Sequence, residues 1–207
     1  QTLLFIGDSI TDCGREHPVG QRRLSSLGEG YVSFVDSILG AVMPETPISV
    51  LNAGISGNRV TDLEARWQSD VLDLEPSWLS VMVGINDVWR QFDIEPCAEQ
   101  VEPEQFELVY RRVLAKTRPQ LDGLVLMTPY FLETNREDLM REKMDAYGAI
   151  TKKLAVEFDA ISVDTQLAFD NYLGHQPSES LCADRVHPNR VGHMILARAF
   201  LRAVGVS

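Results

Sequence analysis

Five short apolar segments, rich in Val, Ile and Leu, recur along this chain of 207 residues, and longer amphipathic segments separate them. The apolar segments are residues 3–6, 48–52, 78–83, 124–127 and 161–163. A strand covered on both faces reads as a continuous apolar run rather than as an alternating pattern. Parallel strands need long crossover connections, which are usually helical. The alternation therefore predicts an α/β fold with a parallel five-stranded sheet.

The intervening segments carry apolar residues at helical spacing. The predicted helices are residues 31–39, 60–74, 104–117, 138–157 and 189–204. Residues 16–30 and 171–183 lack a helical pattern and predict loops, and long loops in compact domains are often functional. Because the alternation runs through the whole chain, we expect one domain over residues 1–207. Its architecture is a three-layer α/β/α sandwich of flavodoxin-like type.

Polar side chains follow the first three predicted strands, at the sheet edge where α/β proteins place their sites. Ser9 follows the first strand in Gly7-Asp8-Ser9, at a tight turn. A glycine-containing loop with Gly57 follows the second strand, and Asn86 follows the third. Acyl transfer passes through an oxyanion that needs two or three N–H donors. The backbone N–H groups of Ser9 and Gly57 and the side-chain amide of Asn86 could supply three.

A serine hydroxyl is a weak nucleophile and needs a base, and the sequence offers one near its end. Asp184 precedes His187 by three residues, close enough in a turn to accept a hydrogen bond from the imidazole. Pro188 restricts His187 to extended backbone and suits the first position of the following helix. His17, His175 and His193 lack this setting, and we interpret them as structural or solvent-exposed.

Charge and cysteine content exclude several classes of function. The formal net charge of −11 would repel a polyanion, so we expect no nucleic-acid partner. Three widely separated cysteines, Cys13, Cys97 and Cys182, predict neither a metal site nor a disulfide scaffold, but reduced thiols. No segment has a signal-peptide pattern or the roughly 20 apolar residues of a membrane span. We therefore expect a cytoplasmic protein with no membrane partner.

The sequence resembles the SGNH hydrolases, also called GDSL-type esterases, in four motifs that occur in the family's order. Gly7-Asp8-Ser9-Ile10 resembles the family's first block, with Ile where many members have Leu. Gly54-Ile55-Ser56-Gly57-Asn58 resembles the second block. Gly84-Ile85-Asn86-Asp87 resembles the third and Asp184-Arg185-Val186-His187-Pro188 the fifth. The resemblance implies catalysis by Ser9, Asp184 and His187, with an oxyanion hole from Ser9, Gly57 and Asn86. It implies neither a metal nor a cofactor.

Residues 4–15, 84–91 and 192–201 look more specifically like bacterial intracellular acetylxylan esterases of this superfamily. This resemblance implies a serine esterase that removes acetyl groups from acetylated xylo-oligosaccharides. It also implies a homo-oligomer. Trp89 follows the third strand and could form a sugar-stacking wall, although core or subunit packing explains an aromatic residue there equally well.

Two alternatives remain. A broad-specificity GDSL-type lipase, arylesterase or thioesterase shares the same motifs, but should present an extended apolar acyl channel. A non-catalytic carbohydrate-binding protein on the same fold predicts the loss of at least one catalytic residue, whereas Ser9, Asp184 and His187 are all present.

Overall fold

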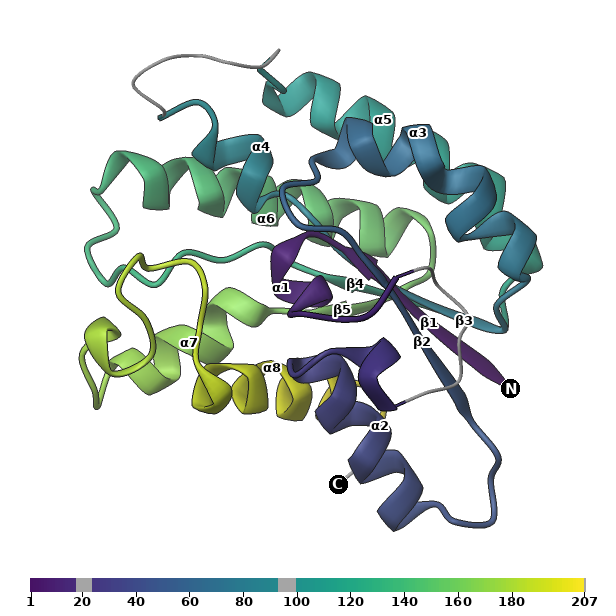
Figure 1. Ribbon diagram of the computed structural model, residues 1–207. Coiled ribbons are helices and arrows are strands. Elements are labelled where there is room, and N and C mark those ends of the chain that lie inside the picture. Colours follow the sequence, from purple (N-terminus) through teal and green to yellow (C-terminus); the bar gives the residue numbers. More distant parts are fainter. Residues whose placement is uncertain (18–23, 93–99, 207) are drawn as a thin grey trace.

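The computed structural model describes residues 1–17, 24–92 and 100–206 of the chain (Figure 1). Its centre is a five-stranded sheet in which every pairing is parallel and the strand order is β2-β1-β3-β4-β5. The strands are β1 (Thr2–Gly7), β2 (Ser49–Gly54), β3 (Trp78–Met82), β4 (Gly123–Met127) and β5 (Ile161–Val163). The predicted strands are therefore confirmed, with ends displaced by at most two residues.

Helices cover both faces of the sheet (Figure 1). One layer contains α2 (Tyr31–Val42), α7 (Thr165–Leu173) and α8 (Arg190–Ala203). The other layer contains α3 (Val60–Asp70), α5 (Pro103–Thr117) and α6 (Leu139–Glu157). The short helices are α1 (Ser9–Asp12) and α4 (Ile85–Trp89), with 3-10 turns η1 (Leu24–Leu27), η2 (Leu72–Leu74), η3 (Arg118–Gln120) and η4 (Ser178–Ser180). This arrangement confirms the α/β/α sandwich.

The strand ends are level, and this brings distant parts of the sequence to one edge. Gly7 pairs with Gly54 of β2 and with Met82 of β3, and Met82 pairs with Met127 of β4. The chain moves from β1 to β2 and then returns past β1 to β3. Ligands of open α/β sheets bind at such a reversal of strand order, outside the carboxyl ends of the strands. Ser9 follows β1, which lies at this reversal.

Two local predictions were wrong, and a third is only partly covered by the described residues. Helix α7 occupies Thr165–Leu173, so the predicted loop of 171–183 begins inside a helix, and η4 interrupts it again. The predicted helix of 60–74 ends at Asp70, and η2 follows as a separate turn. The predicted loop of 16–30 contains η1, and its residues 18–23 lie outside the described residues. Among the described residues, no helix has the length and apolar character that crossing a membrane requires.

Candidate active site

Ser9 is the first residue of α1, and Asp8 caps this short helix. The Asp8 backbone is extended, and its Oδ1 accepts a hydrogen bond from the Ile10 N–H at 3.0 Å. This is the turn-stabilising role expected of an N-cap aspartate. Asp8 is 1% exposed, and burial raises its pKa to about 7. The cap fixes the start of α1, and Ser9 lines a pocket of about 490 Å³ beside it.

Ser9, His187 and Asp184 form one line of hydrogen bonds. The Oγ of Ser9 lies 2.8 Å from Nε2 of His187, and Nδ1 of His187 lies 2.7 Å from Oδ2 of Asp184. Since a carboxylate can only accept, the ring proton is on Nδ1, and Nε2 accepts from the Ser9 hydroxyl. Three residues separated by up to 178 positions thus come together as the sequence predicted.

The Asp184 carboxylate is held by the backbone that follows it. Its Oδ1 accepts from the N–H groups of Val186 at 3.0 Å and His187 at 2.9 Å. Burial alone would raise the pKa of Asp184, but the hydrogen bonds from His187 and Val186 outweigh it and lower the pKa. Asp184 therefore stays ionised, as a group that orients an imidazole must.

The expected role of Pro188 was wrong. Helix α8 begins at Arg190, and the side chain of Asn189 caps it by accepting from the Val191 N–H at 2.9 Å. Pro188 therefore precedes the cap and is not the first helical residue. Asparagine is a strong N-cap residue, and the helix begins at the residue that follows it.

Gly57 and Asn86 line the same pocket as Ser9 and His187. Gly57 has φ of +83°, a conformation that side chains disfavour, and a Cβ there would meet nothing within 4 Å. The glycine is required by its backbone conformation and not by crowding. Asn86 is 3% exposed, and its Nδ2 donates to the Asn58 carbonyl at 3.1 Å. An amide nitrogen carries two N–H groups, so this bond fixes its orientation and its second N–H can serve a ligand.

Acidic side chains hold the loop that carries Gly57. Oδ2 of Asp12 accepts from both the N–H and the hydroxyl of Ser56, at 3.0 and 2.8 Å. Oδ1 of Asp87 accepts from the Val60 N–H at 3.0 Å, which attaches the start of α3 to α4. Asp87 is 1% exposed, and burial raises its pKa to about 7. The loop is therefore attached to both α1 and α4.

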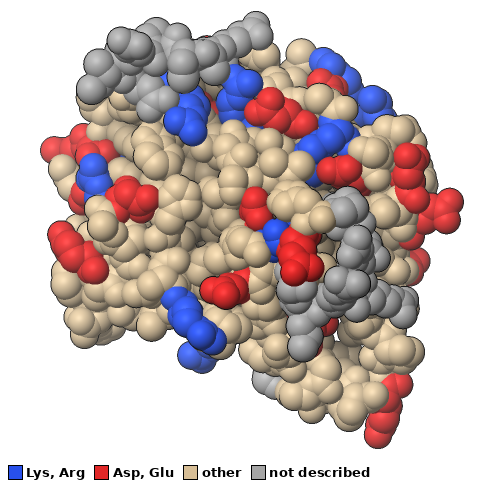
Figure 2. Space-filling view, viewed as in Figure 1, with Lys and Arg blue, Asp and Glu red and all other residues tan. Residues whose placement is uncertain are grey.

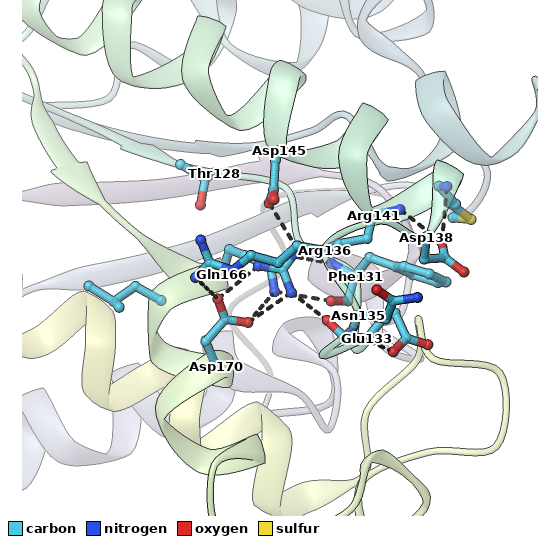
Figure 3. A network of polar contacts seen from close by, with 12 residues as sticks. Thr128, Phe131, Glu133, Asn135, Arg136, Asp138, Arg141, Asp145, Gln166 and Asp170 are labelled. Atoms are coloured by element: carbon cyan, nitrogen blue, oxygen red, sulfur yellow. Dashed lines mark hydrogen bonds and ion pairs between the residues drawn. The ribbon is translucent and has the colours of Figure 1, made fainter.

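A second network holds the segment against which the Asp184–His187 loop packs (Figure 3). Arg141 is 2% exposed and donates to the Glu133 carbonyl and to both carboxylate oxygens of Asp170. Arg185 in turn donates to the Glu133 carboxylate at 2.7 Å, and the Leu132 N–H donates to the Arg185 carbonyl at 2.9 Å.

Aromatic residues near the site divide into two groups. Trp89 is partly buried, lines the pocket, and has its ring centroid 5.8 Å from that of His187. Tyr130 and Phe131 are buried in the core, and the Tyr130 hydroxyl donates to the Val186 carbonyl at 3.0 Å. Only Trp89 is placed where a substrate could touch it.

Two further pocket residues were not predicted from the sequence. His193 is 5% exposed, as a structural histidine should be, and its Nδ1 accepts from the Tyr31 N–H at 3.2 Å. Its Nε2 lies 3.4 Å from Sγ of Cys13, and both residues line the pocket. Cys13 stands four residues after Ser9, one helical turn away, and that spacing was the available signal. His17 and His175 are exposed, and Cys97 lies outside the described residues.

Within residues 1–17, 24–92 and 100–206, no three His, Cys, Asp or Glu side chains are grouped so that they could hold a metal ion. The pocket is lined by the hydroxyls of Ser9 and Ser56, the imidazoles of His187 and His193, the Cys13 thiol and the Asn86 amide.

Comparison with solved structures supports the fold assignment. The crystal structure of Axe2, an acetylxylan esterase from Geobacillus stearothermophilus, superposes with a TM-score of 0.95 at 49% identity, covering 100% of this chain and 94% of that one. LAE5, an alpha/beta hydrolase from the metagenome of Lake Arreo, gives a TM-score of 0.96 at 46% identity, covering 99% and 94%. The fold is that of the SGNH hydrolases, as expected.

Sequence comparison gives the same relationship. An acetylxylan esterase from Geobacillus stearothermophilus is 50% identical over 206 residues, which are 99% of this chain and 94% of that protein. Thioesterase 1/protease 1/lysophospholipase L1 of Escherichia coli is 28% identical over 204 residues, 95% of this chain and 79% of that protein. The model of the GDSL-like lipase/acylhydrolase family matches residues 5–195. The chain therefore belongs to the GDSL-like lipase/acylhydrolase family and is a carboxylic ester hydrolase.

Proposed function

We propose that this protein is a serine esterase that removes acetyl groups from acetylated xylo-oligosaccharides. The observation that carries the proposal is the line from Ser9 Oγ through His187 to Asp184, which opens on a pocket with N–H donors. The 50% identity to an acetylxylan esterase over nearly the whole chain supports the choice of substrate. Three Axe2 variants described as catalytic mutants replace a Ser, an Asp and a His, the same residue types as in this line.

The acylation half-reaction follows from the geometry. Nε2 of His187 takes the hydroxyl proton as Ser9 Oγ attacks the acetyl carbonyl carbon, and Asp184 stabilises the imidazolium. The carbonyl oxygen becomes an oxyanion, which accepts from the N–H groups of Ser9 and Gly57 and from the Asn86 amide. The carbon–oxygen bond to the sugar then breaks, and the sugar oxygen takes the proton from His187. An acetyl-serine and a free sugar hydroxyl result.

Deacylation repeats the same steps with water. His187 takes a proton from water as its oxygen attacks the acetyl-serine, and the second oxyanion uses the same donors. Collapse releases acetate and returns the proton to Ser9. Besides water, these steps use Ser9, His187, Asp184 and the three proposed oxyanion donors.

The open rim of the pocket is the proposed binding place for the sugar. The partly buried ring of Trp89 beside His187 offers an apolar face next to the departing hydroxyl. Figure 2 shows acidic and basic side chains interspersed over one face of the molecule, which suits a neutral oligosaccharide better than a polyanion. We further propose that residues 1–207 act as one domain of a homo-oligomer in the cytoplasm, as the resemblance to intracellular acetylxylan esterases implies.

Acetate release tests the proposal directly. Acetylated xylo-oligosaccharides should release acetate faster than acetylated pectin or acetylated sialic acid, and Ser9→Ala should abolish the release. Nitrophenyl acetate should be cleaved faster than nitrophenyl octanoate. A flat or rising dependence on acyl length would favour a broad lipase or thioesterase. Failure of a fluorophosphonate to label Ser9 would favour a protein that only binds carbohydrate.

A further inference from the structure

Arg66 of α3 makes four hydrogen bonds beneath the pocket. Its Nε donates to Oδ1 of Asn58 at 2.7 Å, and its Nη2 donates to the Gly7 carbonyl at 3.1 Å. Its Nη1 donates to the Ala53 carbonyl and to Oδ2 of Asp70, each at 2.7 Å. The side chain is only 14% exposed, so these bonds are largely shielded from water.

The acceptors of Arg66 belong to the segments that carry the proposed oxyanion donors. The Gly7 carbonyl ends β1 and directly precedes Asp8 and Ser9. The Ala53 carbonyl lies at the end of β2, where the chain enters the loop of Gly57. Asn58 follows Gly57, and its own carbonyl accepts from the Asn86 amide. One guanidinium thus joins the segments of Ser9 and Gly57 directly, and it is linked to Asn86 through Asn58.

An arginine suits this set of acceptors better than a lysine. The Gly7 carbonyl accepts from the Ile55 N–H at 3.0 Å, and Arg66 supplies its second hydrogen bond. The guanidinium offers five donors in a rigid plane, whereas the lysine ammonium is a point charge with three donors on a flexible stem. Burial lowers the pKa of Arg66, and the hydrogen bond and charge of Asp70 oppose this, so the buried cation has its counter-charge one helical turn away.

We propose that Arg66 is a positioning residue that fixes the N–H donors of Ser9, Gly57 and Asn86 relative to one another. This inference rests on the proposed function. Arg66 does not line the pocket and so does not touch the substrate. Its effect is on alignment, and donors displaced by a fraction of an ångström stabilise the oxyanion less.

Arg118 provides a matched control. Its guanidinium also donates to main-chain carbonyls, those of Phe158 at 2.7 Å and Leu121 at 3.1 Å. Phe158 directly follows α6 and Leu121 lies just before β4, so both carbonyls are at the end of the sheet opposite the pocket. Arg66→Lys and Arg118→Lys therefore make the same chemical change in two places, and only the first touches the donor segments.

The test compares both variants with the wild type using nitrophenyl acetate, thermal unfolding and the pH profile of kcat/KM. For Arg66→Lys we expect kcat to fall on the order of 10- to 100-fold and KM to stay nearly unchanged. This fall in kcat should not exceed the fall that follows removal of one complete oxyanion donor. The pH profile should keep its shape, because the His187–Asp184 pair is not altered. Arg118→Lys should lose a similar amount of thermal stability but keep its kcat. Equal kcat values in the two variants would overturn the proposal, as would a fall that appears only in KM.

Two further measurements cover the remaining outcomes. If Arg66→Lys does not fold, Asn58→Ala is tested in its place. This variant removes the side-chain oxygen that accepts from Arg66 Nε but keeps the Asn58 carbonyl that accepts from Asn86. Its kcat should fall several-fold, and an unchanged kcat in the folded variant would contradict the role of Arg66.

If the wild type cleaves no acetyl ester, the proposed function fails, but the rate at which a fluorophosphonate labels Ser9 still depends on the same donors. That rate should fall in Arg66→Lys and stay unchanged in Arg118→Lys, and equal rates would contradict the inference.

Discussion

The polar side chains on the two sides of the pocket differ in burial, whereas the Gly57 backbone is exposed. Asn86 and Asp87, which support the oxyanion side, are 3% and 1% exposed, and Asp12 is 8% exposed. On the acid–base side, the side chains of His187 and Asp184 are 45% and 41% exposed. Donors that stabilise a transient charge must be aligned before the reaction, because any reorganisation then adds to the barrier. Groups that exchange protons with a sugar or water must instead be reached by solvent.

The groups that support the two sides also differ. Arg66, largely buried, attaches the oxyanion side directly to strand carbonyls. Arg141 holds the Glu133 carbonyl (Figure 3), and the Glu133 carboxylate pairs with the exposed Arg185 of the acid–base loop. The buried Tyr130 hydroxyl also donates to the Val186 carbonyl of this loop. The comparison indicates that one buried guanidinium supports the oxyanion side, whereas separate buried and exposed contacts support the acid–base loop.

The largest expected effect is on the acid–base side itself. Asp184→Asn removes the charge that orients His187 and favours the wrong imidazole tautomer, so kcat should fall on the order of 10⁴-fold. Steady-state hydrolysis of nitrophenyl acetate measures the change. Asp164→Asn is the control, because Asp164 also accepts from the N–H three residues later and forms an ion pair, with Lys152 at 2.6 Å, but pairs with no histidine. Equal losses in both variants would remove Asp184 from the proposed catalytic line.

Asn86→Ala tests the oxyanion side. Losing one donor should lower kcat about 10²- to 10³-fold, or about 2.7–4 kcal/mol, while the fold is retained. Gln120→Ala is the control, since its amide also donates to a main-chain carbonyl, that of Lys116 at 3.2 Å. Circular dichroism should show both variants folded. A folded Asn86→Ala protein with near-full activity would exclude Asn86 from the oxyanion hole.

His193 connects the two sides and predicts a pH dependence of stability. It belongs to α8, which follows the His187 loop, and contacts Tyr31 and Cys13 on the nucleophile side. Burial, and less so the charge of His187, lowers its pKa from 6.5 to about 4. Between pH 6.5 and about pH 4 the unfolded chain binds more protons at His193 than the folded chain does. The free energy of unfolding should therefore fall as the pH falls through this range, by roughly 3 kcal/mol in total.

Chemical denaturation at pH 7 and pH 4.5 measures this fall. His193→Asn keeps an acceptor for the Tyr31 N–H but does not titrate, so its stability should change less over that range. Asp8 and Asp87 have pKa values raised to about 7 and act in the opposite direction. The difference between the two proteins therefore isolates His193. Parallel pH curves would show that His193 is not held in its neutral form.

The sequence predicted the sheet because all five strands are short apolar runs separated by amphipathic segments. Helix α7 escaped prediction because its buried face mixes polar residues with the apolar Phe169 and Leu173. It buries Thr165 and Gln166, whose side chains bond to Thr128 and to the Phe131 backbone, while Leu167 is 53% exposed. Tertiary hydrogen bonds, which no local pattern reports, decide which face of this helix is inside.

The predicted site residues that the structure brings to one pocket are those whose chemistry is visible locally. Ser9, Asn86 and His187 are reactive residue types at strand or helix ends, where the fold concentrates function. Arg66 is different, because its spacing from Asp70 is that of an ordinary ion pair on an exposed helix. Its real acceptors, the carbonyls of Gly7 and Ala53, become neighbours only when the sheet forms. A supporting residue of this kind is found from coordinates alone.

The smallest expected effect sharpens the comparison between the two supports. Arg185 has φ of +62°, and asparagine tolerates this conformation, so Arg185→Asn removes the Glu133 ion pair and the contact of the guanidinium over Phe131 without straining the backbone. An exposed ion pair contributes up to about 1 kcal/mol, so kcat should fall by about fivefold at most. Arg136→Asn is the control, because its pair with Asp170 is more exposed and does not reach the loop. A larger loss of kcat in Arg185→Asn than in Arg66→Lys would reverse the comparison, since it would mean that the exposed contact, and not the buried guanidinium, limits the alignment of the site.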